Sequence, residues 1–124
     1  MPFRDQASSL RDIYRSISFI EGFIEGMDLH AFRKDQKTVA AIERMLQIIS
    51  EAAIRLGEEA ESLYPGPPWR NIRGVGNWLR HQYDDPDDEI IWNTIHEDLP
   101  KLKTVVSRAI EGQGKQQGPG PRVE

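Results

Sequence analysis

The sequence predicts an all-α protein: an up-and-down bundle of four main helices, with a kinked last helix and a disordered C-terminal tail. Apolar residues recur at steps of three and four along four long segments, which is the spacing of one helix face. No segment alternates with the period of two typical of strands, and no longer repeat is present. The 124 residues, 38% of them hydrophobic, suffice for one core and are too few for two.

The first helix is predicted over roughly Asp5 to Glu25. Gly26 suits its end, because glycine tolerates the left-handed conformation of a C-terminal cap. The stretch from Leu29 to Lys37 is mixed in character and predicts turns, with Phe32 directed inward. The apolar stripe of this helix consists of Leu10, Ile13, Tyr14, Ile17, Ile20 and Ile24.

The second helix is predicted from Asp35 or Thr38, either of which can cap its start, to Ser62. It carries the most regular apolar stripe of the chain. The segment from Tyr64 to Pro68 follows, with three prolines and one glycine, and cannot continue a helix. The stripe consists of Val39, Ile42, Met45, Leu46, Ile49, Ala53 and Leu56.

The third helix is predicted from Trp69 to about Gln82. Gly74 and Gly76 weaken it by about 1 kcal/mol each relative to alanine, so we expect packing against neighbouring helices to hold it. Its apolar face consists of Ile72, Val75 and Leu79.

The last helix is predicted to begin in the acidic segment 84–89, with Asp85 as its cap and Pro86 in its first turn. Pro100 lacks a backbone donor and should kink this helix before it ends near Ile110. The apolar stripe consists of Ile91, Ile95, Leu99, Leu102, Val106 and Ile110. We therefore expect a helical domain over residues 1–111 and a flexible tail over residues 112–124.

Composition excludes several kinds of chemistry. The net charge of −4 argues against a general nucleic-acid coat protein but permits a local basic patch. Without cysteine the chain has no disulfide, thiolate metal site or cysteine nucleophile. The three histidines are widely spaced, so we expect neither a metal nor another cofactor. Without a membrane span or a signal peptide in view, we expect a cytoplasmic protein that does not contact membranes.

Residues 68–83 concentrate arginine, asparagine, histidine and aromatic side chains on an otherwise acidic chain. This composition suits phosphodiester chemistry without a metal, because histidine can transfer a proton near neutral pH and arginine can bind phosphate. RNA supplies its own nucleophile, the 2′-hydroxyl. A polar stripe on an amphipathic helix is also often no more than a solvated face. The stripe consists of Arg70, Arg73, Asn77 and His81.

Five separate blocks stand out along the chain: Ala41 to Ala53, Tyr64-Pro-x-x-Pro-Trp69, Asn77-x-x-x-His81-x-Tyr83, Ile91-Trp92, and Asp98-Leu99-Pro100-x-Leu102. These blocks and their order resemble those of the HepT-like proteins of the HEPN superfamily. The resemblance extends from about Leu10 to Ile110.

The resemblance implies a homodimeric helical bundle that acts as an endoribonuclease toxin on RNA and is neutralised by a minimal nucleotidyltransferase antitoxin. In that family an arginine, a histidine and a tyrosine form the active motif, which meets its copy across the dimer. The antitoxin adds AMP to the tyrosine. Carried over, His81 is the catalytic histidine, Asn77 is the adjacent polar residue, and Tyr83 is the candidate for modification.

The motif arginine does not carry over, because Gly76 stands at its usual position. We predict that Arg73, one turn earlier, reaches past Gly76 as the phosphate clamp, and that Arg70 and Arg80 bind RNA. Arg80 projects about 100° away from its neighbour His81 and is a weaker substitute. Two alternatives stay open: a catalytically impaired partner subunit of a nucleotidyltransferase, and a helical dimer with an unrelated small ligand.

Overall fold

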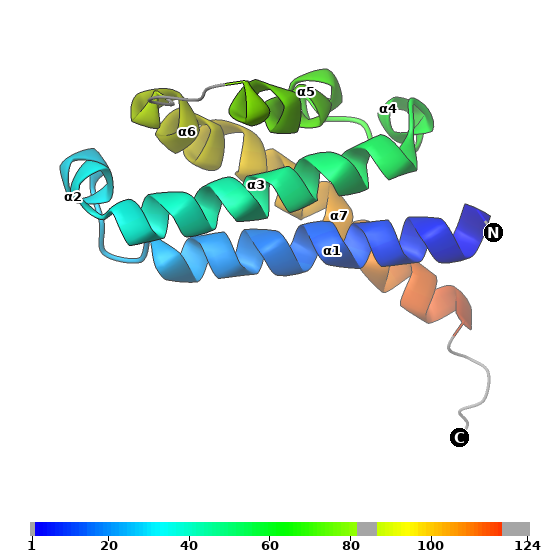
Figure 1. Cartoon of the computed structure of the whole chain (residues 1–124). Helices are drawn as coiled ribbons and strands as arrows, with labels where there is room; N and C mark the ends of the chain where they lie inside the picture. Colours follow the sequence, from blue (N-terminus) through cyan, green and yellow to red (C-terminus); the bar gives the residue numbers. More distant parts are fainter. Residues whose placement is uncertain (1, 82–86, 118–124) are drawn as a thin grey trace.

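The computed structural model describes residues 2–81 and 87–117, and within them every regular element is helical (Figure 1). The predicted all-α bundle is therefore confirmed. The elements are α1 Pro2–Phe23, α2 Leu29–Lys34, α3 Gln36–Leu56, α4 Glu59–Leu63, α5 Trp69–Arg80, α6 Asp88–Asn93, the π-helical turn η1 Thr94–Asp98, and α7 Leu99–Gln117.

The two longest helices of the amino-terminal half, α1 and α3, lie side by side along their length (Figure 1). Helix α5 packs on α3, on the side away from α1, and α7 contacts α1. The predicted stripes of α1 and α3 meet in the core, where Ile13, Ile17 and Ile49 are fully buried or nearly so, but Tyr14, also assigned to the stripe of α1, is exposed. Burying one such side chain contributes about 1.5–3 kcal/mol. No helix within the described residues is both long enough and apolar enough to cross a lipid bilayer.

The stretch predicted as turns contains a short helix, α2. Asp28 caps it, with a carboxylate oxygen accepting from the Ala31 amide at 2.8 Å. Phe32 is fully buried, as predicted. Asp35, one of the two predicted caps, begins α3 and accepts from the amide of Thr38 at 3.0 Å. A helix of only six residues fits between these two caps, which is too short to show a helical period in the sequence.

The predicted end of the second helix, Ser62, is wrong. Helix α3 stops at Leu56 because Gly57 adopts a φ of 80°, a left-handed conformation that glycine takes without a side-chain penalty. The chain then forms the separate helix α4. The predicted apolar stripe already ends at Leu56, and the break that follows it brings Glu61 to α5.

The carboxy-terminal helices also depart from the prediction. The predicted cap Asp85 and first-turn Pro86 lie outside the described residues, and α6 begins after Asp87, whose carboxylate accepts from the Glu89 amide at 2.9 Å. Before Pro100 the helix widens into η1, where the Leu99 amide donates to a carbonyl five residues earlier. A π-turn of this kind shifts the hydrogen-bond register next to the proline.

Helix α7 continues to Gln117, beyond the predicted end near Ile110. Residues 112–117, predicted as the beginning of a disordered tail, are therefore helical. Glycine disfavours a helix without forbidding it, and the composition of this segment alone did not reveal the extension. The rest of the predicted tail, residues 118–124, lies outside the described residues.

Candidate functional site

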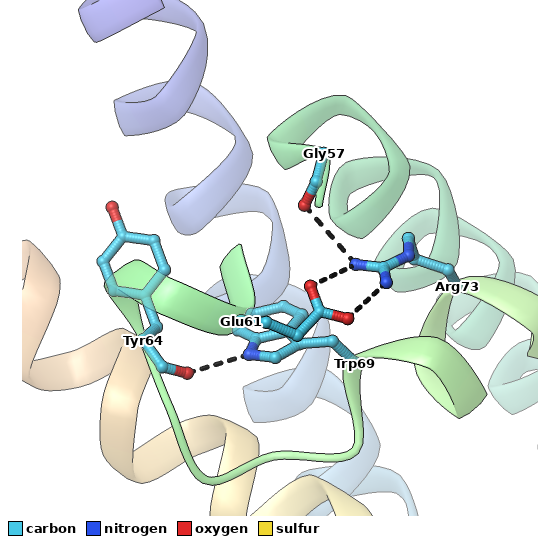
Figure 2. A network of polar contacts seen from close by, with 5 residues as sticks. All are labelled: Gly57, Glu61, Tyr64, Trp69 and Arg73. Carbon is cyan, nitrogen blue, oxygen red and sulfur yellow. Dashed lines mark hydrogen bonds and ion pairs between the residues drawn. The ribbon is translucent and has the colours of Figure 1, made fainter. Parts of the chain in front are cut away.

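Helix α5 carries the candidate site and is anchored at its amino-terminal end. The indole Nε1 of Trp69 donates to the carbonyl of Tyr64 at 2.8 Å, across the proline-rich linker (Figure 2). Trp69, Ile72, Gly76 and Leu79 form the buried face of the helix. Packing therefore holds this glycine-containing helix, as the sequence predicts.

Gly76 lies directly against α3, where it contacts Ser50. Its amide donates to the buried Ser50 Oγ at 3.2 Å, and that hydroxyl donates to the Arg73 carbonyl at 2.8 Å. A Cβ at position 76 would lie 2.8 Å from Ser50 Oγ and 3.0 Å from Ser50 Cβ. Gly76 therefore faces α3. Ser50 occupies the space where a side chain of residue 76 would lie, so the glycine does not open a path along which Arg73 could reach a cleft.

Arg73 is held by α4. Its Nη1 donates to Glu61 Oε1 at 3.1 Å, its Nη2 donates to Glu61 Oε2, and Nη1 also lies 3.4 Å from the Gly57 carbonyl oxygen (Figure 2). The hydrogen bonds from Arg73 lower the pKa of Glu61, and the same contact raises the pKa of Arg73. The Arg73 side chain is only 20% exposed. The predicted phosphate clamp is thus paired with a carboxylate.

The structure does not bring Arg73 and His81 together. Eight residues of helix separate them by about 12 Å along the axis and about 80° around it. Sequence reasoning missed Glu61 because the ion pair depends on the break at Gly57, which sets α4 against α5. The only signal available was a glutamate in a short segment flanked by glycine and proline.

His81 caps the carboxy-terminal end of α5 and is exposed. Its Nδ1 lies 2.9 Å from the main-chain carbonyl oxygen of Asn77. A carbonyl only accepts, so Nδ1 carries the proton, and in the neutral ring Nε2 is the unprotonated nitrogen. Asn77 contacts the ring through its backbone, and its exposed side chain makes no hydrogen bond within the described residues. The result is an oriented imidazole with a free basic nitrogen.

The other two arginines of α5 are exposed and have no hydrogen bond or ion pair within residues 2–81 and 87–117. Arg70 lies on the same face as Asn77 and His81, because seven and eleven residues are close to whole numbers of helical turns. Arg80 bends toward α3, with Nη1 3.8 Å from where a Cβ on Gly76 would lie. Tyr83, the candidate for modification, lies outside the described residues.

A groove of about 360 Å³ lies beside this face, between α5 and the α6–η1 segment. Burial raises the pKa of the Asp98 carboxyl on its wall, and neighbouring Glu97 raises it further. Sequence reasoning did not find this groove, because its two walls meet only in the tertiary structure. The lining residues are Arg70, Asn71, Gly74, Val75, Trp78, Ile90, Thr94 and Asp98.

The described part of the chain holds no cluster of three histidine, aspartate or glutamate side chains that could bind a metal ion. A helical bundle that presents an oriented imidazole and exposed guanidinium groups on one helix belongs to a class suited to acid–base chemistry on an anionic ligand.

Comparison with known proteins identifies the family within that class. The family described as "Ribonuclease HepT-like" matches residues 13–109, and the chain belongs to it. The "Probable ribonuclease HepT" of Thermococcus cleftensis is 35% identical over 100 residues, which cover 81% of this chain and 91% of the relative. "Putative RNase MJ0127" of Methanocaldococcus jannaschii is 32% identical over 117 residues, covering 91% and 96%. No solved structure gives a significant match.

Proposed function

We propose that this chain is a metal-independent endoribonuclease toxin in which His81 transfers the proton. The observation that carries the proposal is the His81 ring, fixed by the Asn77 carbonyl so that Nε2 is free to act as a base. Membership of a ribonuclease family and the ribonuclease names of two relatives support RNA as the substrate.

In the proposed reaction His81 Nε2 takes the proton of a ribose 2′-hydroxyl. The 2′ oxygen forms a bond to the adjacent phosphorus, and the bond from phosphorus to the 5′ oxygen of the next nucleotide breaks. The products are a 2′,3′-cyclic phosphate and a 5′-hydroxyl. In a homodimer with facing motifs, the second imidazole, in its protonated form, supplies the proton to the leaving oxygen.

The developing negative charge on phosphate requires a cation, and the arginines of α5 differ in availability. Arg73 is already neutralised by Glu61, so we assign it a structural role. Arg80 and Arg70 have no ion-pair partner within the described residues, and Arg80 directly precedes His81. We therefore propose Arg80 as the phosphate-binding group nearest the reaction and Arg70 as a contact further along the RNA backbone.

The proposal includes two partners. The first is a second copy of the chain, because a single copy leaves His81 and both free arginines open to solvent. The second is a minimal nucleotidyltransferase that neutralises the toxin by adding AMP to Tyr83, as the family resemblance implies. We place this system in the cytoplasm.

The test is RNA cleavage in the presence of EDTA by the wild type and by His81→Ala. We expect the variant to lose about a hundred-fold or more of the activity, the usual contribution of general acid–base catalysis. His96→Ala is the matched control, because His96 makes the same contact, Nδ1 to the Trp92 carbonyl at 2.9 Å, but belongs to η1 and not to α5. Equal cleavage by wild type and His81→Ala, or no cleavage of several RNAs by the wild type, contradicts the proposal.

Gly76 favours a second candidate, a catalytically impaired partner subunit of a nucleotidyltransferase. The motif position has no room for an arginine in this packing. Co-expression with the cognate transferase, followed by purification and mass spectrometry, tests it. AMP on Tyr83 and a stable complex, without ribonuclease activity of the unmodified chain, would favour this candidate. The absence of both would remove it.

A further inference from the structure

The three tryptophans of the chain differ in what their rings contact. Trp69 packs against Tyr64, and Trp92 packs between Phe32 and His96, with ring centroids 5.2 Å and 4.3 Å away. The ring of Trp78 has no aromatic partner within the described residues, although it packs partly against the core. The described part contains no buried side-chain polar atom without a partner, so the indole N–H of Trp78 reaches solvent. Among the three tryptophans, Trp78 is therefore the one whose ring stays available for a further aromatic contact.

Trp78 lines the groove between α5 and the α6–η1 segment. Gly74, one turn earlier, leaves the surface beside the indole open, since a Cβ there would meet nothing within 4 Å. The volume of about 360 Å³ lies in the lower part of the range for small-ligand sites, about 300–1,000 Å³. A flat group can therefore approach the indole from the solvent side.

The groove also has polar groups suited to the edge and the backbone of a nucleotide. Asp98, on the π-turn, faces the groove without a hydrogen bond to any described residue, and its two oxygens can accept. Arg70 lies at the same groove and has no ion-pair partner there. Trp78 precedes His81 by three residues, a rise of about 4.5 Å along the helix. A base held here would lie next to the proposed site of cleavage.

We propose that this groove is a nucleobase subsite for the RNA substrate, with the base stacked on Trp78, Asp98 accepting hydrogen bonds from its edge, and Arg70 binding an adjoining phosphate. The inference rests on the proposed ribonuclease function and names the base class that the site prefers. Guanine fits Asp98 best, because its N1–H and N2–H groups present two parallel donors to a carboxylate. Uracil presents one N–H between two carbonyls, which a carboxylate repels. Aromatic stacking itself tolerates any base.

The test separates binding from cleavage. Full-length His81→Ala protein is titrated with 2′-O-methylated GpG and UpU, which contain no free nucleophile, and binding is followed by calorimetry. We expect GpG to bind at least about ten-fold more tightly than UpU. Trp78→Ala on the same background should weaken GpG binding about five- to 150-fold, the equivalent of the usual stacking contribution. Trp78→Phe should retain most of the affinity, and Trp92→Phe is the control outside the groove.

Asp98→Asn tests the base preference, because an amide offers one acceptor and one donor group where the carboxylate offered two acceptors. We expect the ratio of GpG to UpU affinity to fall toward one, while the melting temperature stays near that of the parent. Unchanged GpG binding by Trp78→Ala, or equal affinity for both dinucleotides in the parent, overturns the subsite.

Two further outcomes distinguish this inference from the proposed function. Trp78-dependent GpG binding without any RNA cleavage by the wild type contradicts the ribonuclease proposal and leaves the base subsite standing. Conversely, His81-dependent cleavage with no effect of Trp78→Ala on binding retains the ribonuclease and removes the subsite. If Trp78→Ala changes the mass in sedimentation instead of the binding, the groove is covered by a second copy, and the inference is also wrong.

Discussion

The two ends of α5 differ in whether their polar side chains bind to other parts of the fold. At the amino-terminal end, Trp69 is bonded to the linker and Arg73 to α4 (Figure 2). At the carboxy-terminal end, the His81 side chain makes one hydrogen bond, to its own helix, and Arg80 has no ion pair within the described residues. Of the three arginines of this helix, one is thus ion-paired and two have no ion pair within the described residues. All three have the same chemical type, so only the presence of Glu61 beside Arg73 distinguishes them.

The largest expected effect comes from placing the family arginine at position 76. Gly76→Arg must separate α3 from α5, so we expect a loss of unfolding free energy of about 3 kcal/mol or more instead of a gain in cleavage. Gly76→Ala should cost about 1–3 kcal/mol by the same overlap. Gly74→Ala is the control and should gain about 0.5–1 kcal/mol, since its Cβ meets nothing. Urea unfolding measures all three. A folded, fully stable Gly76→Arg would show that the two helices can adjust freely.

The next largest effect comes from replacing one arginine at each end of α5. Arg80→Gln should lower RNA cleavage about ten- to hundred-fold, the equivalent of one charge-assisted hydrogen bond, with an unchanged melting temperature. Arg73→Gln should lower the melting temperature and leave cleavage near the wild-type rate, because it removes the bonds to Glu61 and Gly57. Cleavage rates and thermal melts of both variants make the comparison. The reverse pattern, with activity lost in folded Arg73→Gln alone, would restore Arg73 as the phosphate clamp.

The smallest effect is a pH dependence of stability. Arg73 lowers the pKa of Glu61, so the folded chain favours the carboxylate more than the unfolded chain does. This contribution is present above the ordinary pKa of 4.5 and is lost as pH falls through the lower folded pKa. We expect the stability difference between wild type and Glu61→Gln to shrink as pH falls below 4.5. Unfolding curves of both proteins test this, with Glu59→Gln as the control on the same helix. A constant difference across that range would mean that the ion pair contributes nothing.

Much of the fold was predictable, because each main helix carries its own apolar stripe and its own breaker or cap. Asp35, the linker after Tyr64 and the buried face of α5 are local features of the sequence. The predicted helix ran on past Gly57 although its apolar stripe ends at Leu56, so the end of the stripe and the glycine together marked the break that the prediction missed. The extension of α7 to Gln117 ran against composition.

The sequence by itself determined the helical bundle, the family, and the spacing of one helical turn between Asn77 and His81. The tertiary structure alone decided which arginine is neutralised and which glycine is enclosed. Glu61 reaches Arg73 from twelve residues away, across a helix break, and Ser50 reaches Gly76 from twenty-six. A contact within one helical turn follows from backbone geometry. A contact between helices depends on how several buried faces pack at once, and residue spacing does not record that packing.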